Sequence, residues 1–187
     1  MDQFSYLTVL ISIILGLGIT QLLGGLGRLL QARRRTRLYW PSIAWVGVLL
    51  VLHVQTWWAM FGLRALQSWD FLGFVLVLLQ PIVLYLLAAL VLPEPSAETP
   101  TDLRQHYYDH SRWFFGLAVL LLVVSLLRDR VLAGHFPTGL NLLMHGLLFV
   151  GWGLGAILRR ETYHRWLVAY TAALMVAYIT VLFRYLR

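Results

Sequence analysis

The chain has 187 residues, of which 60% are hydrophobic and 12% are charged. Soluble domains are about 45–50% apolar, and 23 charged side chains, 15 basic and 8 acidic, are too few to cover a water-exposed surface of this size. A soluble protein is therefore excluded. All the basic residues are Arg, and they give a formal net charge of +7. They lie at the ends of apolar segments, where Arg anchors helices and sets topology, so we expect no nucleic-acid partner. The absence of Cys excludes disulfides, thiolate metal sites and cysteine nucleophiles.

Six apolar stretches are long enough to cross a bilayer, which requires about 20 mostly apolar residues per helix. Backbone polar groups in lipid must be satisfied within each segment, so each stretch is predicted to be a helix. The sequence therefore predicts one all-α integral membrane domain over residues 1–187, a six-transmembrane-helix bundle in a 3+3 arrangement around the cytoplasmic loop 93–112. The predicted helices are 6–30, 42–63, 71–92, 114–132, 140–158 and 166–186.

The only long polar connection also carries a helix start signal. Thr99 is followed by Pro100 and, three residues on, by Asp102. This order fits an N-cap, a proline at the first helical position and an acid in the first turn. The fourth helix is therefore expected to begin near Pro100, before it enters lipid.

Arginine placement predicts the topology. Ten of the 15 Arg lie in the first, third and fifth connections, so these connections are expected on the cytoplasmic side and both termini outside. We expect the membrane to be the cytoplasmic membrane of a bacterium. The basic run of the first connection is placed to contact anionic lipid headgroups, each basic residue contributing about 1 kcal/mol. It consists of Arg33, Arg34, Arg35 and Arg37.

Small residues recur at every fourth position in three of the predicted helices. Small side chains let helix backbones approach closely in lipid, so these positions predict packing seams, either within the bundle or between copies in a homo-oligomer. The alternative is that the glycines and hydroxyls line a narrow polar path. The positions are Ser12, Gly16 and Gly24 in the first helix, Gly151 and Gly155 in the fifth, and Ala169, Ala173 and Ala177 in the sixth.

Two histidines, His53 and His145, lie within apolar spans, where an ionisable side chain usually faces the bundle interior or water. At about 1.5 Å rise per residue their depths differ by roughly 6 Å, so the two rings could meet. Two imidazoles could ligate a b-type haem, relay protons, or form structural hydrogen bonds. His106 and His110 have the i, i+4 spacing of metal ligands, but no third ligand is fixed by the sequence.

Further polar residues lie near the predicted mid-depth. Pro81 removes a backbone donor and crowds the preceding turn, so a kink and a cavity are expected there, although such kinks are also ordinary in membrane helices. The expected polar layer combines His53 and His145 with Thr20, Gln21, Gln55, Thr56, Gln80 and Asn141.

Ser42 and Ser125 have no neighbouring base in the sequence, no Gly-rich phosphate loop follows a strand and no acidic pair lies within a span, so an enzyme is not favoured. The leading hypothesis is a channel or transporter for a small ion or solute, which would pass through the polar midplane. The first alternative is a b-type haem or quinone-linked redox protein. The second is a non-catalytic membrane assembly subunit.

Overall fold

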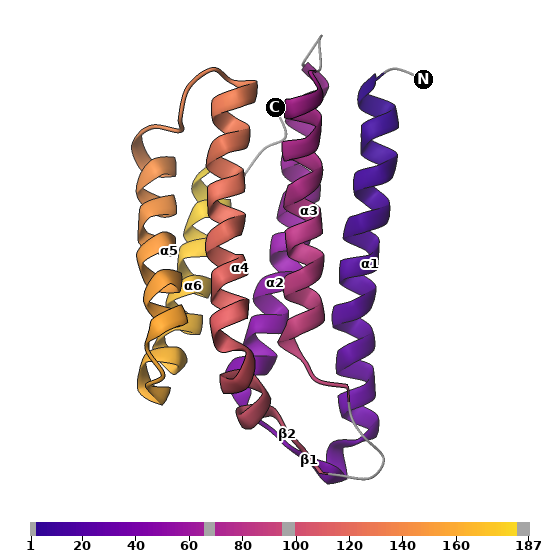
Figure 1. Cartoon of the computed structure of the whole chain (residues 1–187), viewed down its shortest axis with the longest axis vertical. Helices are drawn as coiled ribbons and strands as arrows, with labels where there is room; N and C mark the ends of the chain where they lie inside the picture. The colour runs from indigo at the N-terminus through magenta and orange to yellow at the C-terminus, as the bar shows by residue number, and fades with distance from the viewer. Residues whose placement is uncertain (1–2, 66–69, 95–99, 183–187) are drawn as a thin grey trace.

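The computed structural model describes residues 3–65, 70–94 and 100–182, and six α-helices within this part of the chain run alongside one another in alternating directions (Figure 1). Short 3-10 segments, η1 and η2, follow α1 and α2. The elements are α1 Gln3–Gln31, η1 Arg33–Arg35, β1 Thr36–Arg37, α2 Trp40–Met60, η2 Phe61–Ala65, α3 Phe71–Val91, β2 Thr101–Asp102, α4 Leu103–Leu132, α5 Gly139–Ile157 and α6 Glu161–Leu182.

Four of the described segments are long and apolar enough to cross a membrane: Ser5–Gln31, Trp40–Arg64, Phe71–Val91 and Gly139–Ile157. The prediction of an all-α chain with membrane-spanning helices is confirmed. α4 and α6 are helical as predicted, but they do not reach the same measure of length and apolarity within the described residues.

The fourth helix begins at Leu103, so the second half of the expected loop 93–112 is helical. The cap is Asp102, whose carboxylate accepts hydrogen bonds from the backbone N–H of Arg104 (2.9 Å) and Gln105 (3.1 Å). Pro100 therefore precedes the helix and does not occupy its first turn. An acid satisfies two orphan N–H groups at once here, which sets the helix start. The predicted cap Thr99 and the predicted helical residues 183–186 lie outside the described residues.

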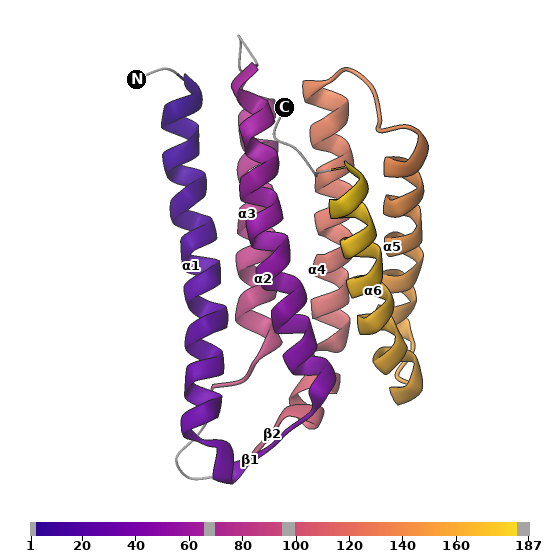
Figure 2. The same ribbon diagram turned by 180° about the vertical axis from the view of Figure 1, so that it is seen from behind.

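The helices pack in an order that joins the two halves of the chain. α1 packs against α2 and α3, α3 against α4, α4 against α5, and α5 against α6, while α2 also reaches α6. α1 lies at one edge of the bundle and α5 and α6 lie at the other in both views (Figures 1 and 2). The core is apolar, with Leu22, Leu84 and Phe115 fully buried.

A two-residue parallel ladder ties the first and third connections together at one end of the bundle. Thr36 pairs with Thr101 and Arg37 pairs with Asp102. An Arg37–Asp102 contact of 3.9 Å adds a weak, exposed ion pair. We call this the ladder end; α2 and α4 start there, and α1 starts and α6 ends toward the opposite end (Figure 1).

Candidate functional site

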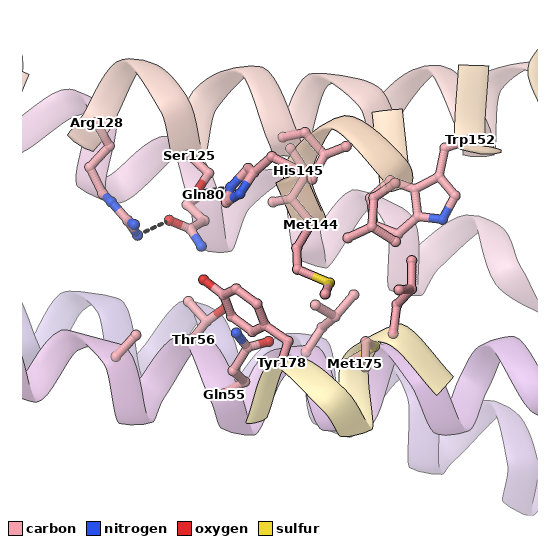
Figure 3. Close-up of a pocket in the computed structure, with 16 residues that line it drawn as sticks. Gln55, Thr56, Gln80, Ser125, Arg128, Met144, His145, Trp152, Met175 and Tyr178 are labelled. Atoms are coloured by element: carbon pink, nitrogen blue, oxygen red, sulfur yellow. Dashed lines mark hydrogen bonds between the residues drawn. The ribbon is translucent and has the colours of Figure 1, made fainter. Parts of the chain in front are cut away.

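A cavity lies among α2, α3, α4, α5 and α6 (Figure 3). It offers about 100 Å³ to the centres of water-sized molecules. One water needs roughly 10–15 Å³ by this measure, so the cavity has room for several waters or one small solute. Its wall is formed by Leu52, Gln55, Thr56, Ala59, Gln80, Leu121, Leu122, Ser125, Arg128, Met144, His145, Leu148, Trp152, Leu174, Met175 and Tyr178.

Arg128 marks the polar end of the cavity, and its guanidinium is held by two neighbours. Nη1 donates to Gln80 Oε1 at 2.5 Å, while Nε and Nη2 donate to Asp129 Oδ1 at 3.1 and 2.7 Å. The Arg128 and Asp129 side chains are only 18% and 24% exposed. Among the residues that the structure describes, Arg128 is the one charged group in the cavity wall. Because Asp129 neutralises it, the polar end carries no net charge.

His145 stands beside this polar end with both ring nitrogens engaged. Nδ1 lies 2.9 Å from the backbone oxygen of Asn141, and a carbonyl only accepts, so Nδ1 carries the proton. In the neutral ring Nε2 then accepts from Ser125 Oγ, 3.3 Å away. The Asn141 side chain accepts from the Tyr178 hydroxyl at 3.1 Å, which joins α5 to α6. These bonds hold the His145 ring in place at the cavity wall.

Trp152 forms the apolar end of the cavity, opposite Arg128 in the close-up (Figure 3). Its indole Nε1 donates to Thr171 Oγ1 at 3.1 Å, and both residues are buried. Its ring lies 6.4 Å from that of Trp45, which packs edge-on against Phe114 (5.2 Å) and Phe115 (5.5 Å). We call these four rings the aromatic barrier. It occupies the space between the cavity and the ladder end.

A buried histidine supports the barrier from the ladder end. His164 is fully buried, and its Nε2 donates to the Leu158 backbone oxygen at 2.7 Å. Nδ1 must then accept from the Tyr107 hydroxyl at 3.0 Å. Burial lowers the pKa of His164 and raises the pKa of Tyr107, so both groups are held neutral. His164 also packs against the barrier ring Phe115, at 5.4 Å between centroids.

Exposed ion pairs close the same end at the surface. Glu161 at the start of α6 accepts from Arg104 Nη2 of α4 at 2.9 Å and from Arg165 Nη2 at 2.6 Å. The hydrogen bond from Arg104 is the main reason that the pKa of Glu161 is lowered. These groups are solvent-accessible, so the contacts orient α4 and α6 more than they stabilise them.

The predicted polar layer is divided by the structure. Gln55, Thr56, Gln80 and His145 line the cavity, and Asn141 binds groups that line it. The helix α3 continues through Pro81 without interruption. Thr20 and Gln21 do not line the cavity; the Thr20 hydroxyl is exposed and donates to the Gly16 backbone oxygen at 2.8 Å.

The histidine pair His53 and His145 is not brought together. His53 is fully buried against α1, where its ring fills the space beside Gly18. Its Nδ1 donates to the Leu49 backbone oxygen at 2.7 Å, and no partner is found for Nε2 within the described part of the chain. His145 faces the cavity on the other side of α2, so this arrangement does not offer both rings to one haem iron.

The candidate metal pair His106 and His110 stacks with 4.3 Å between ring centroids. His106 Nε2 donates to the Leu90 backbone oxygen and His110 Nδ1 to that of His106, both at 3.0 Å. No group of three or more His, Asp or Glu placed to hold a metal is found among residues 3–65, 70–94 and 100–182.

The small residues that were predicted to form packing seams lie at helix contacts in α5 but are mostly exposed in α1 and α6. In α5, an added Cβ would lie 3.2 Å from Leu167 at Gly151 and 2.8 Å from Leu167 at Gly155. In α1, Ser12 and Gly16 are exposed and Gly24 is half-buried, so this face points away from the other helices. In α6, Ala169 and Ala173 are exposed and Ala177 is half-buried. Close approach in α1 is instead made by Gly18, against His53, and by Gly25, against Leu92.

The basic run ends outside the bundle. Arg33, Arg34 and Arg35 form η1 and are exposed, as is Arg37.

Sequence reasoning missed Ser125, Tyr178 and Thr171 as parts of the site and treated Arg128 as an interfacial residue. Ser125 and Arg128 are three residues apart and so share a helix face. That spacing was the available signal, since it places a hydroxyl and a cation together within an apolar helix.

Comparison of the chain with protein-family models, with curated proteins and with solved structures gives no match. The site geometry is therefore the basis for any functional conclusion.

Proposed function

We propose that this protein is a six-span membrane transporter for a small uncharged solute, with the cavity as its solute site. The observation that carries the proposal is a cavity with polar groups at one end and closure by the aromatic barrier at the other. A carrier alternates between states that are open to one side of the membrane at a time. A site that is sealed on one side is what such a cycle requires, whereas a channel would need a path open to both sides.

An uncharged solute is favoured over an ion because of the charge balance. Arg128, the charged group of the described cavity wall, is already paired with Asp129. A cation would meet a guanidinium, and an anion would find no net positive charge to offset the loss of its hydration. The wall offers hydrogen bonds from Gln80, Ser125 and Thr56 without a net charge, which suits a neutral polar molecule.

The six-span arrangement is supported by the position of α4 and α6. α4 packs between α3 and α5, and both of these helices are apolar enough to cross the membrane. α6 packs against α5 and α2. If only four helices crossed the bilayer and α4 and α6 lay outside it, α4 would be separated from α3 and α5, beside which it lies along its length (Figures 1 and 2).

The ladder end is proposed to face the cytoplasm of a bacterium, which leaves both termini outside. The support is the Arg count, together with the exposure of Arg33, Arg34, Arg35 and Arg37 where anionic headgroups would lie. The outward small-residue face of α1, with Ser12 and Gly16 exposed, supports association with a second copy.

The test is solute flux into proteoliposomes, followed by stopped-flow light scattering after an osmotic jump. Urea, acetamide, glycerol and potassium acetate form the panel, and protein-free liposomes give the background. At least one uncharged solute should enter faster with the protein present. Gln80→Leu should slow that entry about tenfold, since it removes a polar group of the wall worth roughly 1.4 kcal/mol.

Gln21→Leu is the matched control, because Gln21 is also a glutamine within an apolar helix but does not line the cavity. Both variants should elute from size exclusion as the wild type does. A protein that moves none of the four solutes, or equal slowing by both variants, would contradict the proposal. The redox alternative is tested on the same preparation, since a bound b-type haem gives a Soret absorption band.

A further inference from the structure

The hydrogen-bonding capacity of the cavity wall can be assigned group by group. Gln80 uses its Oε1 to accept from Arg128, which turns its amide nitrogen away from the guanidinium (Figure 3). Two amide N–H donors of Gln80 therefore remain. Arg128 carries five N–H donors, and its bonds to Gln80 and Asp129 use three of them. The polar end thus offers donors fixed in planar groups.

An acceptor stands close to these donors. Because His145 Nδ1 donates to a carbonyl, Nε2 of the neutral ring is an acceptor, and the Ser125 hydroxyl donates its proton to it. The Ser125 oxygen therefore retains lone pairs and acts toward a ligand as an acceptor. Gln55 and Thr56 lie on the facing wall, opposite Gln80 and Ser125 in Figure 3, and each adds a hydrogen-bond donor and an acceptor.

The rest of the wall is apolar, with Leu52, Leu122 and Leu148 among the lining residues. These side chains cannot hydrogen-bond, so they suit a short alkyl group or the flat face of a small molecule. The ligand must therefore be small and uncharged, with an acceptor and a donor at one end.

We infer that the solute is a small uncharged amide, a molecule of the class of acetamide or urea. Its carbonyl oxygen accepts from Gln80 and Arg128, and its N–H donates to Ser125. The inference rests on the proposed function and names its substrate class. A carboxylate of the same shape has no donor for Ser125 and brings a charge that the Arg128–Asp129 pair does not neutralise. A polyol lacks the planar carbonyl that matches the donors of Gln80 and Arg128.

The decisive variant is Gln80→Glu. A glutamate keeps the oxygen that accepts from Arg128 and nearly the same volume, but it replaces the two N–H donors with a second acceptor. Acetamide and urea entry into proteoliposomes should fall about tenfold or more, the effect of losing a hydrogen bond of roughly 1.4 kcal/mol. Ser125→Ala, which removes the acceptor, should slow amide entry in the same direction.

The same panel of solutes separates the proposed transport function from the assignment of an amide as the solute. Entry of glycerol or acetate without acetamide and urea would overturn the amide assignment and leave a transporter in place. Entry of amides that Gln80→Glu leaves unchanged would also overturn it.

A flux measurement that shows no solute movement would remove the transport role, and binding then decides the amide assignment. Saturation-transfer NMR with acetamide on the purified protein in detergent measures this directly. A signal that Gln80→Glu abolishes and Gln21→Leu retains would support the amide site. A missing signal in the wild type would refute it.

Discussion

The imidazole of His53 occupies the space that Gly18 leaves open between α1 and α2. A Cβ built on Gly18 would lie 2.9 Å from His53 Cδ2 and closer still to Nε2. His53 cannot easily turn away, since its Nδ1 is bonded to the Leu49 backbone oxygen. The histidine and the glycine are therefore a complementary pair that holds two helices together.

Gly18→Ala should destabilise the protein by about 1–3 kcal/mol, the usual cost of overpacking a buried contact. Thermal unfolding in detergent, followed by circular dichroism, measures the loss. Gly47→Ala on α2 is the control, because nothing lies within 4 Å of a Cβ there, and its higher helix propensity should leave stability unchanged or slightly raised. In a His53→Ala background the penalty at Gly18 should shrink; an undiminished penalty would mean that the two residues are not coupled.

Thr171→Val should destabilise the bundle by about 1–3 kcal/mol, because it leaves the buried Trp152 indole N–H without its acceptor. Thr180→Val is the control, because it makes the same substitution in the same helix, α6. The Thr180 hydroxyl is exposed and donates to backbone oxygens of its own helix, so its loss should have little effect. Chemical denaturation in mixed micelles compares the two, and equal midpoints would argue against the Trp152–Thr171 bond.

The cap of α3 gives another paired comparison. Asp70 accepts from the Gly73 backbone N–H at 3.0 Å, so Asp70→Ala should cost about 1 kcal/mol. Thr138 stands at the corresponding position of α5 but makes no capping hydrogen bond with its side chain. Thr138→Ala should therefore be nearly neutral. Melting temperatures at neutral pH test the difference, and a larger loss at Thr138 would contradict the assigned caps.

Stability should fall as the pH is lowered through the titration of His164. Burial places the pKa of His164 in the folded protein below its ordinary value of about 6.5. The unfolded chain therefore takes up a proton first, and stability decreases as the pH falls from about 6.5 toward the folded-state pKa. His164→Gln, which does not titrate, should flatten this dependence in melting curves at several pH values. His106, whose pKa is also lowered by burial, contributes in the same direction and retains part of the slope. A slope equal to that of the wild type in His164→Gln would exclude the assignment.

The membrane class and the helical content follow from composition and segment length, because lipid leaves few choices for the backbone. Helix ends were harder to place. The polar start of α4 carries Arg104, Asp109 and Arg112, so the membrane-spanning part was placed from residue 114, although the helix itself was expected to begin near Pro100. The structure forms a helix there because Asp102 caps it and because Tyr107 packs inward.

The polar layer was predicted in part, because sequence gives depth along a helix but not the direction in which a face points. Gln55, Gln80 and His145 lie at similar depths and turn toward one cavity, whereas Thr20 at comparable depth turns outward. The spacing of the small residues in α1 likewise does not show which way their face points, and in the structure this face does not pack against the other helices of the chain. Gly18, which makes the close contact, lies off that face.

The short ladder between Thr36–Arg37 and Thr101–Asp102 restricts how the bundle can move. It joins the segments that lead into α2 and α4, so the starts of these helices cannot separate unless the ladder breaks. Farther from the ladder, the same two helices contribute to the polar half of the cavity wall, α2 with Gln55 and Thr56 and α4 with Ser125 and Arg128. The ladder therefore holds these two helices together at one end of the bundle, away from the polar groups that they contribute to the cavity.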